Sequence, residues 1–365
     1  MIEKVDMYNG GNSKRKRVCL TGGGTAGHVM PNVALIPYLQ KEGVDLYYIG
    51  SSGIEKEIIA GTGIKFRKIL SGKLRRYFSI HNFIDGFKVI IGCIQSFFIL
   101  LFHRVDVVFS KGGFVSVPVC VAAKVLGIRI ITHEADLSVG LANRIIARLA
   151  DKICYSFEDT KKYLPQSKAV FTGIPVRDEL FSGNKEVGFS FCGFDPMDQR
   201  KIILVMGGSL GAVRINNVLS ESLEELLKSF RIIHITGKHS NPNPIPIPGS
   251  YAPFQYISAE LKDVFSITDF VVARAGANSI FEYLALKIPM LLIPLKIGSR
   301  GDQLQNANYF KKKGYAHVLD ETEMNSKLFV EEVMHLEKHC DEIKANMNEI
   351  SQNASILITN LLLSE

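Results

Sequence analysis

The sequence lacks the cysteine and acidic patterns that mark secreted or metal-dependent proteins. Its six cysteines, at positions 19, 93, 120, 154, 192 and 340, form no Cys-x-x-Cys pair and no cluster with histidine. We therefore expect reduced thiols packed in the cores of a cytosolic protein. The sequence contains no Asp-x-Asp or comparable metal-binding pair. Neither a metal nor a cofactor is therefore expected.

A signal peptide is also missing. Residues 1–17 are polar, and the apolar run that follows Lys14-Arg-Lys-Arg17 is too short for a signal core. We expect residues 1–16 to form a disordered basic leader. The chain has 365 residues, 47% hydrophobic and 22% charged, which supports packed cores and argues against disorder elsewhere. At ~150 residues per domain, this length predicts two domains.

The net charge and the one long apolar run leave two interpretations open. A formal charge of +7 suits either a phosphate-rich substrate or an anionic membrane surface. Residues 83–102 approach the ~20 residues of a spanning helix, but Asp85, Lys88 and Gln95 interrupt them. We expect a buried or half-exposed helix of the first domain. Just upstream, the basic and aromatic cluster Lys73-Leu-Arg-Arg-Tyr-Phe78 fits either an anionic lipid surface or a solvated loop.

The first glycine loop follows a short predicted strand. Val18-Cys-Leu-Thr21 precedes Gly22-Gly-Gly-Thr-Ala-Gly27-His28, and a helical pattern comes next. This order is typical of the phosphate-binding turn of a βαβ unit, and Gly22-x-Gly24-x-x-Gly27 also fits the dinucleotide fingerprint. A dinucleotide enzyme needs an acidic residue after the second strand. Gly50-Ser51-Ser52 follows that strand instead, which argues against a nicotinamide cofactor.

The second half of the chain repeats this pattern. Residues 18–32 align without gaps on residues 202–216, and residues 106–113 echo residues 269–276. Two similar α/β halves are therefore predicted, each with glycine loops at the carboxyl ends of parallel strands, where ligands bind. His28 in the first loop is matched by Ala212 in the second. This difference favours a chemical role for His28 over a capping or structural one.

Residues 271–282 form a second candidate anion site. A predicted strand leads to Gly276 and to a helix that opens at Asn278-Ser279, and backbone N–H groups at such a helix start bind phosphate. We place the domain boundary near Arg177, before an irregular stretch of residues 181–200. The predicted domains are residues 17–177 and 178–347, with a C-terminal helix at about 348–365 that packs back on the first domain.

The motifs taken in order are more specific than any one of them. Residues 22–31 are followed by 110–116, His133-Glu134, 140–143, Gly173-x-Pro-Val-Arg177, 207–211 and the block 271–306. From about Arg17 to the C-terminus the chain resembles the MurG family, the family 28 N-acetylglucosaminyltransferases of peptidoglycan synthesis. The resemblance implies the GT-B fold, in which two Rossmann-like α/β domains with parallel sheets face each other across a cleft.

The resemblance implies a reaction and a set of residues. N-acetylglucosamine (GlcNAc) would pass from UDP-GlcNAc, with inversion, to the C4 hydroxyl of N-acetylmuramic acid (MurNAc) pentapeptide linked through diphosphate to undecaprenol. His28 is the implied general base, since an imidazole of pKa ~6.5 can serve near neutral pH, and Asn143 is the implied acceptor residue. The implied donor residues are Thr25, Ala26, Gly27, Arg177, Ser209, Ile257, Ala277, Asn278, Ser279, Glu282 and Gln303. Among them, Glu282 would hold the ribose hydroxyls and Gln303 would face the sugar.

The implied partners are UDP-GlcNAc, the lipid-linked MurNAc-pentapeptide and an anionic membrane surface. Other cell-wall synthesis proteins are further candidates, and no nucleic acid is expected. The implied location is the cytoplasmic face of the bacterial membrane, as a peripheral protein. In place of a metal, fixed N–H dipoles at helix starts would stabilise the departing UDP.

Three positions depart from the family pattern. Ala26 stands where many relatives carry Gly, Asp136 where some carry Asn, and Asp302 replaces a Gln beside Gln303. We therefore assign no site role to Asp136, and Glu134 stays open as an acid/base or a structural residue. The rival hypotheses are a glycosyltransferase acting on another lipid such as diacylglycerol, a nicotinamide-dependent oxidoreductase, and a nucleotide-sugar-binding or membrane-recruitment subunit whose catalysis lies in a partner.

Overall fold

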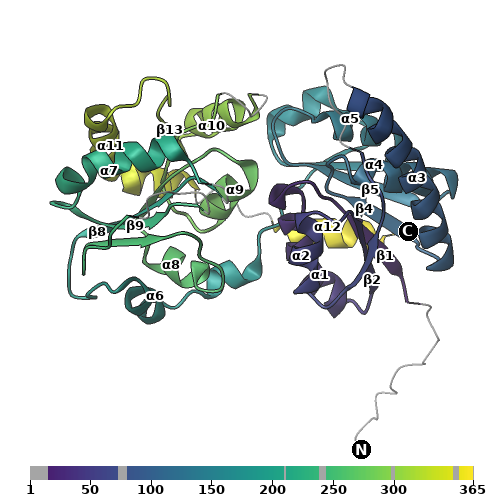
Figure 1. Cartoon of the computed structure of the whole chain (residues 1–365), viewed down its shortest axis with the longest axis horizontal. Coiled ribbons are helices and arrows are strands. Elements are labelled where there is room, and N and C mark those ends of the chain that lie inside the picture. Colours follow the sequence, from purple (N-terminus) through teal and green to yellow (C-terminus); the bar gives the residue numbers. More distant parts are fainter. Residues whose placement is uncertain are drawn as a thin grey trace, which may run out of the picture. The chain divides into compact units, whose positions relative to one another are not determined.

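The computed structural model describes residues 15–72, 80–208, 211–237, 244–296, 301–347 and 353–364. Within this part lie two parallel β-sheets (Figure 1), one of seven strands in the order β3-β2-β1-β4-β5-β6-β7 and one of six in the order β10-β9-β8-β11-β12-β13. The first sheet consists of β1 (Arg17–Thr21), β2 (Asp45–Gly50), β3 (Lys65–Lys68), β4 (Val107–Ser110), β5 (Arg129–Glu134), β6 (Lys152–Tyr155) and β7 (Ala169–Phe171). The second consists of β8 (Lys201–Met206), β9 (Phe230–Ile235), β10 (Tyr251–Phe254), β11 (Phe270–Ala273), β12 (Met290–Leu292) and β13 (Ala316–Val318).

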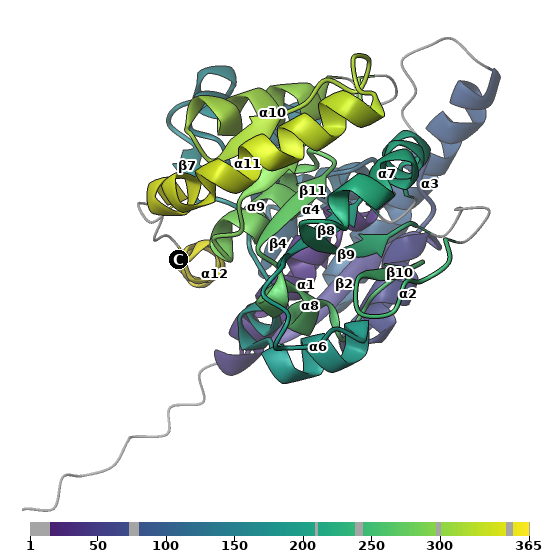
Figure 2. The ribbon, with the colours of Figure 1, turned by 90° about the vertical axis from the view of Figure 1, so that its left-hand side faces the viewer.

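Helices connect the strands, as a parallel sheet requires. Those of the first half are α1 (Met30–Lys41), α2 (Ile54–Ala60), α3 (Ile80–Phe102), α4 (Ser116–Val125) and α5 (Leu141–Leu149). Those of the second half are α6 (Lys185–Cys192), α7 (Val213–Leu226), α8 (Leu261–Ile267), α9 (Ala277–Ala285), α10 (Asp302–Lys312), α11 (Ser326–Met347) and α12 (Ala354–Leu363). In the second half of the chain, α7 packs against α11, and α6 packs against α8 (Figures 1 and 2).

The chain packs into two compact units. The first contains the chain up to Thr132 together with Arg148–Asp151 and Thr359–Glu365, and the second contains His133–Ala147 and Lys152–Ile358. The end of α12 is tied to the first unit, because Lys16 Nζ donates to the carbonyl oxygens of Leu363 and Ser364, both at 2.9 Å.

The two repeated sequence segments occupy equivalent places in the sheets. β1 lies between β2 and β4, and β8 lies between β9 and β11. The Arg17 N–H donates to Asp106 Oδ2 at 2.7 Å, and the Asp106 N–H donates back to the Arg17 carbonyl at 2.9 Å. Ile202 and Asp269 make the same exchange at 2.7 and 2.9 Å. The predicted repeat is therefore a repeat of strand pairing, and the predicted two-sheet α/β fold is confirmed.

The central strands are continuous apolar runs because both faces of a parallel sheet are covered. Val18, Cys19 and Leu20 of β1 have no exposed surface, and residues 202–205 of β8 are at most 2% exposed. All six cysteines are free thiols, five of them buried, as expected. This packing fixes the strand ends rigidly, and the glycine loops start there.

The long apolar run forms α3, a half-exposed helix of the first unit. Only 17% of the segment Asp85–Phe102 is buried, although its length and composition would suffice to cross a membrane. Gln95 accepts a hydrogen bond from the Leu70 N–H at 2.7 Å, and Lys88 pairs with Asp85 at 3.6 Å, so the polar interruptions have local partners. α3 packs on α4. The basic cluster at Lys73, Arg75 and Arg76 lies outside the described residues.

The stretch expected to be irregular, residues 181–200, contains a helix, so that prediction was wrong in part. Asn184 caps α6 by accepting a hydrogen bond from the Val187 N–H at 3.2 Å, and Gly193 ends it in the left-handed region at φ 65°. The eight residues between these caps, Lys185–Cys192, carry too little periodicity to indicate a helix.

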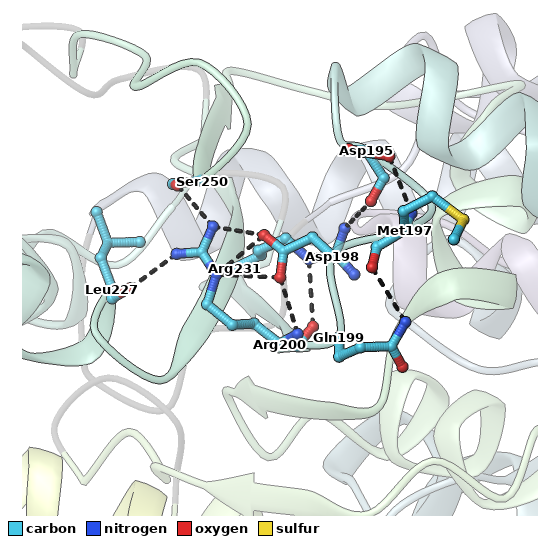
Figure 3. Close-up of polar contacts among 8 residues, drawn as sticks. All are labelled: Asp195, Met197, Asp198, Gln199, Arg200, Leu227, Arg231 and Ser250. Carbon is cyan, nitrogen blue, oxygen red and sulfur yellow. Dashed lines mark hydrogen bonds and ion pairs between the residues drawn. The ribbon is translucent and has the colours of Figure 1, made fainter.

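Two arginines hold the remaining irregular segment before β8 (Figure 3). Arg200 donates to Asp198 Oδ2 at 2.6 Å and to the Leu227 carbonyl at 2.8 Å. Arg231 on β9, only 3% exposed, donates to the carbonyls of Asp195 at 2.7 Å and Arg200 at 3.2 Å. Hydrogen bonds from Arg200 lower the pKa of Asp198 to about 2. These bonds tie the segment to β9 in place of regular secondary structure.

Candidate active site

The loop between β1 and α1 brings predicted site residues into contact. Residues Ala26–His28 form a single 3-10 turn that leads into α1. The Nδ1 atom of His28 lies 3.0 Å from the Thr25 hydroxyl oxygen. His28 is half-buried and Thr25 is exposed. Thr25 can therefore orient the imidazole at the open side of the loop.

Close backbone approach shapes this loop. A Cβ on Gly22 would lie 2.2 Å from the His28 carbonyl oxygen, so the loop can turn back over the end of β1 only with glycine there. Gly113, in the loop after β4, has φ +79°, and a Cβ on it would lie 2.3 Å from the Gly23 carbonyl oxygen and 3.3 Å from His28 Nδ1. Two strand-end loops of the first unit therefore meet at His28.

Glu55 in α2 anchors the same loop and was missed by the sequence analysis. It is fully buried, and its carboxylate accepts hydrogen bonds from the N–H groups of Gly24 at 3.3 Å and Ser51 at 2.9 Å, and from the Ser51 hydroxyl. This is the first acidic residue after Gly50-Ser51-Ser52. Its oxygens bind the loop itself, so Glu55 is a positioning residue and does not take the place of a ribose-binding acid.

Glu134 organises the turn from β5 into α5. Its carboxylate accepts hydrogen bonds from the N–H groups of Asp136 and Gly140, both at 3.0 Å, and from Asn143 Nδ2 at 2.9 Å. Burial raises the pKa of Glu134 to about 7, and the Asp136 charge adds to this effect. Of the two roles left open for Glu134, these contacts support the structural one.

Asn143, the predicted acceptor residue, belongs to the same turn. It is 7% exposed, and besides Glu134 its Nδ2 donates to the His133 carbonyl at 3.1 Å. Its Oδ1 is buried without a hydrogen-bond partner in the part of the chain that the structure describes. A role in acceptor binding stays a prediction, with Oδ1 as the atom that would carry it.

The two aspartates that depart from the family pattern both take part in hydrogen bonds that join residues 136–138 to α10. Asn306 Nδ2 donates to Asp136 Oδ1 at 3.1 Å, and the Ser138 hydroxyl donates to Asp302 Oδ1 at 2.6 Å. The Leu137 N–H donates to Asn306 Oδ1 at 3.2 Å. Asp136 and Asp302 therefore link the turn before α5 to the helix that carries Gln303.

The predicted donor residues Arg177 and Glu282 form an ion pair. Arg177 Nη2 lies 3.3 Å from Glu282 Oε1, and the side chains are 18% and 17% exposed. Arg177 Nη1 also contacts Glu179 Oε1 at 2.9 Å, but that carboxylate is 62% exposed. Burial raises the pKa of Glu282, while the Arg177 charge lowers it. The structure thus joins a cation suited to phosphate and a carboxylate suited to ribose hydroxyls.

The start of α9 is the second predicted anion site. Gly276 precedes the helix in an extended conformation, and a Cβ on it would meet no atom within 4 Å, so the approach to the helix start is open. Ala277 is buried at 6% exposure, while Asn278 and Ser279 are half-exposed in the first turn. The helix N-terminus can therefore receive an anion.

Three further residues that were predicted to bind the donor differ in their surroundings. Gln303 in the first turn of α10 accepts a hydrogen bond from the Leu295 N–H at 3.0 Å, which fixes the orientation of its amide. Ile257 is 4% exposed and part of the hydrophobic core, so it could meet a base only through its main chain. Ser209 lies outside the described residues.

A separate cavity of about 560 Å³ opens in the second unit. Phe171, Phe281, Tyr309 and Lys313 are among the residues that line it. None of the predicted donor residues in the described part of the chain lines it. This cavity is therefore distinct from the predicted donor residues of the second unit.

Comparison with known proteins identifies the family. Residues 18–155 match the glycosyltransferase family 28 N-terminal domain, and residues 202–361 match the family 28 C-terminal domain. A protein of Clostridium botulinum is 48% identical over 350 residues, which is 95% of this chain and 97% of the relative. The chain belongs to glycosyltransferase family 28. The predicted family is thereby confirmed.

Other family 28 relatives are similarly close. A Lachnospira eligens protein is 48% identical over 95% of this chain and 98% of its own length, and a Staphylococcus carnosus protein is 47% identical over 92% and 93%. Each of the three is named UDP-N-acetylglucosamine–N-acetylmuramyl-(pentapeptide) pyrophosphoryl-undecaprenol N-acetylglucosamine transferase.

Solved structures support the fold of this family 28 protein. Acinetobacter baumannii MurG matches with a TM-score of 0.73 at 23% identity, over 95% of this chain and 99% of that one. The UDP-GlcNAc 2-epimerase of Neisseria meningitidis matches with a TM-score of 0.67 at 15% identity, over 96% and 100%. At these identities the likeness concerns the fold alone.

Proposed function

We propose that this protein transfers GlcNAc from UDP-GlcNAc to the C4 hydroxyl of undecaprenyl-diphosphate-linked MurNAc-pentapeptide. The observation that carries the proposal is 48% identity, over 95% of the chain, to a transferase of that name. No nicotinamide cofactor is needed for this reaction, in keeping with the engagement of Glu55 by the glycine loop.

We assign donor binding to residues 178–347 together with Arg177. Arg177 would contact the diphosphate and Glu282 the ribose hydroxyls, and the N–H groups at the start of α9 would stabilise the charge that develops on the departing UDP. Gln303, held by Leu295, would face the sugar. We also assign Thr25, Ala26 and Gly27 of the first unit to donor binding. The Arg177 charge opposes the effect of burial on the pKa of Glu282.

We assign the general base to His28. When its Nδ1–H donates to the Thr25 hydroxyl, Nε2 carries the basic lone pair. Nε2 accepts the proton of the acceptor C4 hydroxyl while the hydroxyl oxygen forms a bond to the anomeric carbon of GlcNAc. The bond between that carbon and the UDP oxygen breaks in the same displacement, so the configuration inverts. A single base suffices because UDP leaves as a stabilised anion.

We assign membrane contact to residues 17–177, with α3 as the contact surface. Large apolar side chains at helical spacing are exposed on α3: Phe87 57%, Ile90 58%, Ile91 43%, Ile94 53%, Phe98 49%, Leu101 47% and Phe102 77%. A continuous apolar helix face of this kind suits insertion at the interface of a bilayer. The lipid-linked acceptor would be reached there, at the cytoplasmic face of the membrane. Other cell-wall synthesis proteins stay candidate partners.

Mass spectrometry of the lipid product tests the reaction. The protein is incubated with UDP-GlcNAc and the undecaprenyl-linked MurNAc-pentapeptide in vesicles. We expect an acceptor larger by one GlcNAc residue, with a new linkage of inverted configuration in its NMR spectrum. An unchanged acceptor in the presence of bound UDP-GlcNAc would contradict the proposal and favour a donor-binding subunit.

A further inference from the structure

Three histidines lie together in the second unit, although the sequence analysis expected no metal. His317 lies on the edge strand β13, and His335 and His339 lie one helical turn apart on α11. Their ring centroids are 4.7, 5.6 and 4.5 Å apart. The sequence does not reveal this group, because His317 and His335 are 18 positions apart and only the packing of α11 on β13 brings them together.

The distances are suited to a single ion. One nitrogen from each ring lies within 4.8 Å of the others. Tetrahedral zinc with Zn–N bonds of ~2.0–2.1 Å needs nitrogens ~3.3 Å apart. His335 is exposed and the other two are half-exposed. Side-chain rotations that shift the ring nitrogens by about one ångström would therefore bring them to the spacing of zinc ligands without moving the backbone.

The hydrogen bonding of one ring is that of a metal ligand. His339 Nδ1 lies 2.8 Å from the His335 carbonyl oxygen. A carbonyl can only accept, so Nδ1 carries the proton and Nε2 presents a lone pair. Metal-binding histidines are commonly fixed in this way by a second hydrogen bond. His339 is thereby held in the tautomer that binds a cation through Nε2.

Two oppositely charged side chains, Lys311 and Glu342, act on His317. Burial and the neighbouring His335 and His339 lower the pKa of His317 to about 4, with Lys311 acting in the same direction and Glu342 opposing it. Glu342 lies three residues beyond His339 on the exposed side of α11.

We propose that His317, His335 and His339 form a binding site for a zinc-class divalent transition metal, which joins the edge strand β13 to α11. Imidazole nitrogens favour zinc, copper, nickel and cobalt over magnesium and calcium. The fourth position is open to water. The role is structural: the ion fastens α11 to the sheet that also carries α9 and α10. This inference is independent of the proposed transferase activity.

Zinc titration of the tag-free full chain tests the site. The protein is freed of metal with EDTA, exchanged into buffer and titrated with ZnCl₂ by calorimetry. We expect one equivalent of zinc, and an affinity at least ~10–100-fold lower in the His335→Ala and His339→Ala variants, since even loss of a supporting group costs that much. His103→Ala, a half-exposed histidine of the first unit, serves as the matched control and should bind like the wild type.

Two further measurements distinguish the loss of a metal ligand from the loss of folding. Alanine favours helix, so both α11 variants should keep the metal-free melting temperature of the wild type. Zinc at ~100 times its dissociation constant should raise the melting temperature of the wild type by ~5–10 °C and leave that of the double variant unchanged. Equal zinc binding by the wild type and the His335→Ala/His339→Ala double variant, or no zinc binding by the wild type, would overturn the proposal.

Discussion

The buried pair of Arg177 and Glu282 makes the most direct prediction about donor binding. The Glu282 side chain is only 17% exposed. A hydrogen bond from a ribose hydroxyl to its carboxylate is therefore shielded from water. Such bonds contribute about 1.5–3 kcal/mol. Because 1.4 kcal/mol is a factor of ten, the Glu282→Gln variant should bind UDP ~10–150-fold more weakly than the wild type.

Calorimetric titration with UDP measures this loss without the need for an acceptor. Glutamine keeps the shape of the side chain and removes its charge, so packing around α9 should persist. Glu179→Gln is the matched control, because Glu179 also contacts Arg177 but is 62% exposed and its pairing is screened by solvent. An unchanged dissociation constant for UDP in Glu282→Gln, with the control equally unchanged, would refute the ribose role.

Three more outcomes follow from named contacts. His28→Ala should reduce turnover by ~10²–10⁴-fold and leave the dissociation constant for UDP-GlcNAc unchanged; wild-type turnover would remove His28 from the mechanism. Because the pKa of Glu134 is raised by burial to about 7, its contribution to stability is present at low pH and is lost as pH rises. In urea unfolding the wild type should therefore lose up to about 3 kcal/mol relative to Glu134→Gln between pH ~4.5 and ~7, and parallel pH profiles would contradict this. Replacing Ile94 and Phe98 of α3 by serine should weaken binding to anionic vesicles ~10-fold or more, whereas Val213→Ser, at a 70% exposed site on α7, should not; equal binding by all three proteins would exclude α3 as the membrane surface.

The sequence predicted the parts of the fold that depend on local pattern and repetition. The segments 18–21 and 202–206 were recognisable as strands because strands covered on both faces are unbroken apolar runs. Their glycine loops were recognisable because a close approach such as that of Gly22 to the His28 carbonyl excludes other residues. Helix α6 was missed because its signals are two caps around a short segment.

The candidate site was predictable from the sequence only where the residue type itself indicates a chemical role. His28 stood out against Ala212 in the repeat, and Arg177 and Glu282 were assigned through the family resemblance. Their mutual ion pair was not predictable, since 105 residues separate them. Glu55 was missed because a buried carboxylate beneath a glycine loop resembles any charged residue of a surface helix. The histidine cluster was missed for the same reason as the ion pair: it exists only through tertiary packing.

The most direct test of the central claim is a choice between acceptors. Labelled UDP-GlcNAc is offered with undecaprenyl-linked MurNAc-pentapeptide and, in a parallel reaction, with diacylglycerol, with EDTA in both. We expect label on the MurNAc lipid alone, at a rate that EDTA does not change. Label on diacylglycerol alone would keep the family and the donor site but contradict the proposed acceptor.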